Sequence, residues 1–262
     1  MVKSINMENN SKIKKEITDC YTDFFERKEF EVNPKNCGIL ENGVLRKDKK
    51  LKFATYPYIG SQYGEKSKIL FIGLEIGKDE YPVSIGSFEE RQESIDSENN
   101  YTNTTYNHHI AGTLVTAIYF NKDKVWEKIE NTKNYKDAIQ ILNKNIKNPL
   151  LYVALTNFYK FVTQGKELRS DPIDRQYISK ESREYEQKLL LDEIEIFDPD
   201  IIIFQSVEFD PLTKTKYQDF LKKLLKQLKD QNKKIEIWVG PHPAYYGSHK
   251  PKEYLSKFNE IK

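Results

Sequence analysis

The chain contains few of the residues on which disulfide, metal and membrane architectures depend. Its 2 cysteines in 262 residues, Cys20 and Cys37, are too few for a disulfide framework or a four-cysteine metal cluster. No apolar run approaches the roughly 18 residues that a membrane-spanning helix needs, and the opening MVKSINMENNSKIKKE lacks the apolar segment of a secretory signal. We therefore expect a cytoplasmic protein that does not enter a membrane.

Several motifs of common enzyme classes are also absent. The chain has no GxxxxGK[ST] phosphate loop and no GxSxG elbow, and GLEIGKD at 73–79 lacks the third glycine of a dinucleotide-binding turn. His108 and His109 are adjacent, but neighbouring side chains on a helix point about 100° apart, which disfavours shared coordination of one metal. The sequence predicts neither a metal nor a cofactor.

Charge gives no strong indication of a partner. The 42 basic and 40 acidic residues leave a net charge of +2, and a mean hydropathy of -0.73 is typical of a soluble chain with a heavily charged surface. The net charge therefore does not indicate a nucleic-acid partner, although a local basic face is compatible with one.

Four short, nearly continuous apolar runs stand out from residue 68 onward. They lie at 68–77, 150–158, 200–206 and 234–240. Segments with helical periodicity separate them, at 107–120, 135–146, 181–197 and 214–230. Strands buried on both faces lack polar alternation. The pattern therefore predicts an α/β fold with a parallel sheet and helices on both of its faces.

The first 62 residues lack the strand–helix alternation of the rest of the chain. Residues 1–10 predict a polar tail, 11–28 carry apolar residues at helical spacing, and 31–62 contain the glycines and prolines of a loop. We therefore divide the chain into an N-terminal helical and loop extension, 1–62, that packs on the core, and an α/β domain, 63–262.

Polar residues follow the predicted strands at the positions where ligand sites form. In parallel sheets, ligands bind beyond the carboxyl ends of the strands. Glu75 lies at the end of the first run, Asn157 at the end of the second and Ser206 at the end of the third, and His242 comes just after the last. A carboxylate, a carboxamide and an imidazole are thus expected on one rim, with ordinary loop residues as the alternative reading of each.

Short motifs at these positions resemble those of the uracil-DNA glycosylase superfamily. The likeness spans about residues 66–262 and runs in order through IGLEIG, HIAGTL, LTNFYK, EIEIFDPDIIIFQS and the His-Pro-Ala at 242–244. The resemblance implies a three-layer α/β/α sandwich around a central four-stranded parallel sheet. It also implies that DNA is the partner and that no cofactor is needed.

The resemblance assigns roles to individual residues. Glu75 takes the position of a carboxylate that activates water. His242 takes the position of a hydrogen-bond donor to the leaving base, and Asn157 takes the position of the residue that reads the base edge. The remaining substrate-pocket residues that it suggests are Gly73, Leu74 and the stacking aromatic Tyr106, with Tyr81 or Phe88 as alternatives to Tyr106.

Contacts to DNA are expected from small, basic and aromatic residues of the same loops. These are Gly77, Lys78, Lys160 and Ser206 toward phosphates, and Tyr245 and Tyr246 as a wedge beside the extruded nucleotide. In the alternative reading, the lysines are ordinary surface residues and the tyrosines pack on the C-terminal helix.

The motifs depart from the family pattern at Ile76, where proline is usual, and at Ala244, where serine is usual. The iron–sulfur cysteines of one branch are absent. The segment between Gly77 and His108 is longer than usual and contains the polar, aromatic stretch NNYTNTTYN. This segment lies where the family has the wall of its base pocket, so a remodelled wall is expected. Such a wall favours a larger or modified base over plain uracil as the substrate.

The sequence therefore predicts a monomeric DNA glycosylase that hydrolyses the N-glycosidic bond of a flipped-out base and leaves an abasic site. The base is uracil or a hypermodified pyrimidine such as the glucosylated hydroxymethylcytosine of phage DNA, and the setting is repair or anti-phage defence. Two alternatives stay open. One is a catalytically inactive DNA-binding relative, and the other is a nucleotide- or sugar-processing α/β enzyme with Glu75 and His242 as an acid–base pair.

Overall fold

The structure of the chain is a computed structural model. The described residues are 2–25, 40–41, 44–45, 56–74, 88–98, 108–145, 149–160, 180–211, 217–243 and 250–261. No helix within these ranges is long and apolar enough to cross a membrane.

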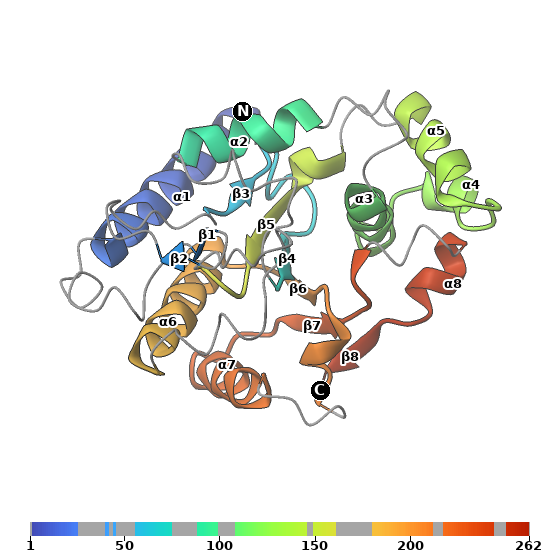
Figure 1. Cartoon of the computed structure of the whole chain (residues 1–262). Coiled ribbons are helices and arrows are strands. Elements are labelled where there is room, and N and C mark those ends of the chain that lie inside the picture. The colour runs from blue at the N-terminus through green and yellow to red at the C-terminus, as the bar shows by residue number, and fades with distance from the viewer. Residues whose placement is uncertain are drawn as a thin grey trace.

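The described residues form a mixed α/β structure (Figure 1). The helices are α1 (Val2–Phe25), α2 (Phe88–Glu98), α3 (His108–Phe120), α4 (Trp126–Ile129), α5 (Tyr135–Asn145), α6 (Lys180–Phe197), α7 (Gln218–Asp230) and α8 (Pro251–Leu255), with 3-10 turns η3 (Pro149–Tyr152) and η5 (Val207–Phe209). The strands are β1 (Leu40–Glu41), β2 (Val44–Leu45), β3 (Tyr58–Ile59), β4 (Ile69–Gly73), β5 (Val153–Asn157), β6 (Ile201–Phe204), β7 (Glu236–Val239) and β8 (Asn259–Ile261).

The main sheet has six strands in the order β3-β5-β4-β6-β7-β8. The four apolar runs of the sequence form its centre, where β5, β4, β6 and β7 pair in parallel. The expectation of a sheet with four parallel strands is incomplete, because β3 and β8 add an antiparallel strand at each edge. These edge strands are 2 and 3 residues long, too short to leave a period-two pattern in the sequence. The sheet is therefore mixed.

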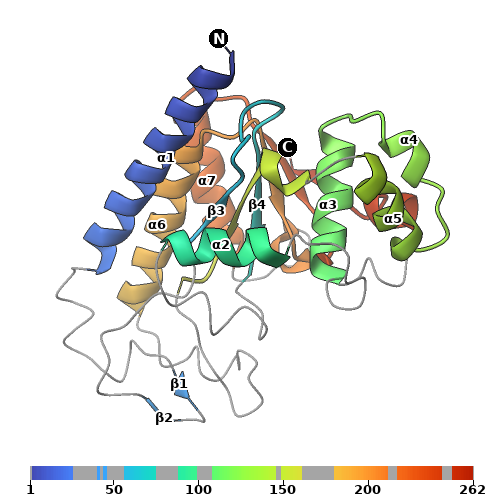
Figure 2. The same cartoon turned by 90° about the horizontal axis from the view of Figure 1, so that it is seen from above.

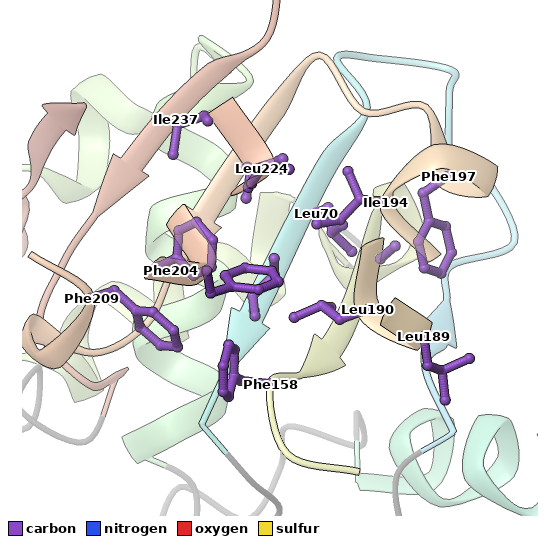
Figure 3. Packing of buried hydrophobic residues seen from close by; sticks show 14 of the residues in the cluster. Leu70, Phe158, Leu189, Leu190, Ile194, Phe197, Phe204, Phe209, Leu224 and Ile237 are labelled. Carbon is purple, nitrogen blue, oxygen red and sulfur yellow. The ribbon is translucent and has the colours of Figure 1, made fainter. Parts of the chain in front are cut away.

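Both faces of the sheet are covered by helices, as the apolar runs predict. Alternate residues of a strand point to opposite faces. Leu70 and Ile72 accordingly pack with α1, α6 and α7, whereas Ile69 and Phe71 pack with α3, α5 and α8. Figure 2 shows the two helix groups on opposite sides of the strands. Figure 3 shows the first cluster, where side chains of α6 and α7 meet those of β4 and β6.

Helix α1 corrects the expected polar tail, because it begins at Val2 and not near residue 11. Its residues Ile13, Ile17 and Tyr21 lie four apart and are buried against α6. Asn10 is also buried and donates a hydrogen bond from Nδ2 to the carbonyl of Ser61 at 3.1 Å. Part of the first 62 residues therefore belongs to the protein core.

The turn after α6 allows a prediction about acid stability. Asp198 adopts a left-handed φ of 45° and accepts hydrogen bonds from Lys233 at 2.8 Å and Lys68 at 3.1 Å. These hydrogen bonds hold the pKa of Asp198 below its ordinary value, so the carboxylate stabilises the fold above the unfolded pKa of about 4 and loses this effect as pH falls through the lower, folded pKa. Asp198→Asn keeps a residue that tolerates this φ but removes the charge.

We expect Asp198→Asn to lower the free energy of unfolding at pH 7 by less than about 1 kcal/mol, because the pair is half-exposed and solvent weakens it. The difference from the unsubstituted protein should shrink as pH falls below the unfolded pKa of about 4 toward the lower, folded pKa. Urea unfolding of both proteins between pH 3 and 7 measures this. An equal difference at both ends of the range would show that charge is not the cause.

Candidate active site

The strand order reverses between β4 and β6, which makes their carboxyl ends the favoured position for a ligand. Helices α3 to α5 follow β4 and pack on one face of the sheet, whereas α6 follows β5 and packs on the other. In open α/β sheets, a crevice forms where consecutive connections depart to opposite faces. The loops after β4, β5, β6 and β7 therefore define the candidate site.

Gly73 and Asn157 lie side by side at the ends of β4 and β5. A Cβ atom on Gly73 would come within 2.6 Å of Oδ1 of Asn157, so only glycine leaves room for this carboxamide. Beyond the strands the backbones stay paired, because Phe158 donates to the carbonyl of Gly73 and Tyr159 to that of Leu74, both at 2.8 Å. Gly73, Leu74 and Asn157 thus lie together, as the sequence predicts.

The Asn157 side chain is more than nine-tenths buried, with 8% of its surface exposed. Its Oδ1 lies beside Gly73. A carboxamide carries donor and acceptor groups in one planar unit. Asn157 therefore brings both kinds of hydrogen-bonding group to the carboxyl edge of the sheet.

His242 follows β7 in a turn that is held firmly in place. Gly240 extends the β6–β7 pairing by donating to the carbonyl of Phe204 at 2.9 Å. Pro241 and Pro243, on either side of His242, are buried, and His242 itself is partly exposed. A Cβ atom on Gly112 of α3 would lie 2.6 Å from the carbonyl oxygen of Pro243, so the turn packs directly on α3.

The end of β6 lies between these two groups. Gln205 donates from its backbone to the carbonyl of Ile72 and from Nε2 to Thr113 of α3, at 2.9 and 2.8 Å. Ser206 is buried, and its hydroxyl accepts a hydrogen bond from the backbone of Glu208, which caps η5. A phosphate contact at Ser206 stays a prediction.

Lys160 does not have the role that the sequence suggested. Its side chain is fully buried, and Nζ donates to the two carboxylate oxygens of Glu193 at 2.7 and 2.8 Å and to Oγ1 of Thr156 at 2.7 Å. An ammonium group enclosed in this way cannot reach a DNA phosphate. The prediction of a phosphate contact is therefore wrong. The carboxylate that pairs with Lys160 belongs to Glu193 of α6, and the spacing of residues in the sequence does not reveal this long-range contact.

Phe88 is likewise excluded as the stacking aromatic. It is buried in the core beside α1, with its ring 6.2 Å from that of Tyr56. The other predicted residues of the site lie outside the described residues, and their roles stay predictions. They are Glu75, Gly77, Lys78, Tyr81, Tyr106, Tyr245 and Tyr246.

Sequence reasoning missed the buried cluster around Lys160. Tyr21 of α1 donates from its hydroxyl to Glu193, and Thr156 donates to the same carboxylate at 2.7 Å. Burial lowers the pKa of Lys160, with Glu193 acting against this, and burial raises the pKa of Tyr21 well above its ordinary value. The one signal in the sequence is the apolar, aromatic setting of the lysine in NFYKFV.

Two glycine substitutions test the geometry of the site. Gly73→Ala should displace the Asn157 carboxamide but cost the fold no more than about 1 kcal/mol, because the obstructing atom ends a side chain that can rotate. Gly112→Ala should cost more, since its Cβ would meet the backbone of Pro243. Urea unfolding and the NMR signals of the Asn157 side-chain amide measure the two effects. Unchanged amide signals in Gly73→Ala would contradict the packing described.

Comparison with protein-family models, with curated proteins and with solved structures finds no match for this chain. Within the described residues, no group of three His, Cys, Asp or Glu side chains could hold a metal ion. The residues at the carboxyl ends of the parallel strands are the basis for the functional proposal.

Proposed function

We propose that the protein is a DNA glycosylase of the uracil-DNA glycosylase type, which hydrolyses the N-glycosidic bond of a flipped-out base. The observation that supports this most is the buried Asn157 carboxamide, held beside Gly73 at the end of β5, on the same edge of the sheet as His242. A donor and an acceptor in one rigid group suit the reading of a base edge. Four adjacent parallel strands with helices on both faces are compatible with the three-layer fold of that family.

The rim between Asn157 and His242 spans two strands. Asn157 ends β5 and His242 follows β7, and these strands are three positions apart in the sheet order. At about 4.8 Å between neighbouring strands, this separation is roughly 14 Å. The carboxyl ends of β4 and β6 lie between the two residues, at the switch point where a ligand is expected.

In the proposed mechanism the nucleotide leaves the DNA stack and enters this space. Asn157 hydrogen-bonds to the base edge. His242 donates to the oxygen on which negative charge builds as the base leaves, and a positioned donor of this kind stabilises the transition state. Glu75, the residue after Leu74, stabilises the oxocarbenium-like sugar or orients the attacking water, as a carboxylate does in glycoside hydrolysis.

The proposed substrate is a modified pyrimidine, such as glucosylated hydroxymethylcytosine, with uracil as the simpler possibility. Support comes from the sequence between Gly77 and His108, whose length and composition favour a larger pocket than that for uracil. The same chemistry would serve repair or defence against phage DNA.

Mass analysis of bases released from duplex DNA tests the proposal. The duplexes carry uracil, hypoxanthine, 5-hydroxymethylcytosine or its glucosylated form, and alkali then reveals abasic sites. We expect one free base and alkali-labile breaks at its position. Salt-sensitive DNA binding without any released base would instead identify an inactive relative. Turnover of a free nucleotide or sugar that duplex DNA does not inhibit would identify a small-molecule enzyme.

A further inference from the structure

The buried cluster around Lys160 encloses the backbone on both sides of Asn157. Thr156 precedes Asn157 and Lys160 lies three residues after it, and these two side chains hydrogen-bond to each other at 2.7 Å. Both also bind the carboxylate of Glu193 on α6. Residues 156–160 are thus closed into a loop by contacts that lie beneath the candidate site.

The main chain of this loop is fixed as well. Lys160 donates from its backbone nitrogen to Oε1 of Glu186 at 2.8 Å, and the two residues between Asn157 and Lys160 donate to the carbonyls of Gly73 and Leu74. Each backbone donor after Asn157 up to Lys160 therefore has an identified acceptor. The loop has no free donor that would favour a different conformation.

Helix α1 takes part in the same cluster. Tyr21 donates to Glu193, and its ring stacks on Tyr56 with the centroids 4.6 Å apart. The ammonium of Lys160 lies 5.9 Å from the centroid of the Tyr21 ring. Three distant segments of the chain, in α1, β5 and α6, therefore converge on one buried ion pair.

Stability alone does not account for this arrangement. Lys160 and Glu193 have no exposed side-chain surface, and desolvating two charges costs about as much as their attraction returns. Apolar residues of similar volume often serve stability equally well in such positions. Beyond apolar packing, the ion pair provides directional hydrogen bonds, which tie Thr156 and Lys160, on either side of Asn157, to Glu193.

We propose that Lys160 and Glu193 are positioning residues, which fix the backbone on both sides of Asn157 and so keep its carboxamide where it discriminates between base edges. This inference rests on the proposed function. A carboxamide that could rotate would present its donor and acceptor interchangeably and would lose selectivity. The ion pair acts through Asn157 and does not touch the substrate.

The decisive variant replaces both charges at once. Lys160→Met/Glu193→Leu keeps the buried volume and removes both charges of the ion pair, while buried Glu186 keeps its hydrogen bond from the backbone of residue 160, so the fold should persist. The matched control is Lys66→Met/Asp123→Asn, which removes the 2.7 Å ion pair Lys66–Asp123 while leaving the amide oxygen that accepts from Val125. This control pair contacts neither Asn157 nor its neighbours.

Two measurements follow for each protein. The first is selectivity, as the ratio of kcat/KM for duplexes carrying the released base and plain cytosine. We expect this ratio to fall by about tenfold or more in the double variant and to stay unchanged in the control. The second is the NMR signal pair of the Asn157 side-chain amide, expected sharp in the unsubstituted protein and in the control but broadened in the double variant.

The two measurements separate the failure of this inference from failure of the proposed function. If the unsubstituted protein releases no base, the proposed function fails, and the amide signals still test the positioning. Unchanged amide signals together with unchanged selectivity in the double variant would overturn the inference. Tyr21→Phe, which removes one hydrogen bond to Glu193 but keeps the ring, provides a milder test if the double variant does not fold. It should broaden the same amide signals, and sharp signals in it would count against the positioning role.

Discussion

Replacing His242 by alanine should lower the rate of base release by about 100- to 1000-fold, the range measured when one preorganised donor to a developing oxyanion is removed. The fold should be nearly unaffected. His242 is partly exposed, whereas the packing of its turn comes from Pro241, Pro243 and the contact with Gly112. The loss should therefore appear in kcat, with binding of the duplex almost unchanged.

Single-turnover release of base with enzyme in excess measures this rate, and thermal unfolding checks the fold. Gln231→Ala is a suitable control because Gln231 is exposed and lies before β7, at the opposite end of the strand that leads to His242. His242→Gln retains a donor and should recover part of the rate. A His242→Ala protein with the rate of the unsubstituted enzyme would remove His242 from the mechanism.

The centre of the fold could be predicted from the sequence because its signals are local. The apolar runs that became β4 and β6 are continuous since helices cover both faces of the sheet. Helix α7 shows a regular apolar face, with Phe220, Leu221 and Leu224 buried. The start of α1 at Val2 could not be predicted, because residues 2–10 carry no apolar stripe that marks a buried helix.

The candidate site was predictable in its location but not in its packing. The switch-point rule correctly places Gly73 and Asn157 beside each other and His242 on the same edge. It does not show that Phe88 is in the core or that Lys160 is enclosed by α6. Both facts depend on which helix crosses which strand, and this is decided by contacts between residues far apart in the chain.

Removing Lys160 alone should destabilise the protein far more than removing the whole ion pair. Lys160→Met leaves the Glu193 carboxylate buried without its cation, and breaking a buried pair in this way costs about 3–5 kcal/mol. The double variant Lys160→Met/Glu193→Leu should recover most of this free energy. Urea unfolding of the two variants gives both values. A single variant as stable as the double one would mean that Thr156 and Tyr21 alone satisfy the carboxylate.

The complementary variant Glu193→Leu should show a distinctive pH dependence. Burial already lowers the pKa of Lys160, and the substitution removes Glu193, the group that opposes this shift most, while Glu186 remains and opposes it less. A lysine whose folded pKa lies below its unfolded value of about 10.4 binds fewer protons when folded, so the stability of Glu193→Leu should rise with pH between those two pKa values. Lys160→Met/Glu193→Leu lacks the titrating group and should not show this rise. The difference between the two slopes would therefore identify Lys160 as the buried charge that Glu193 neutralises.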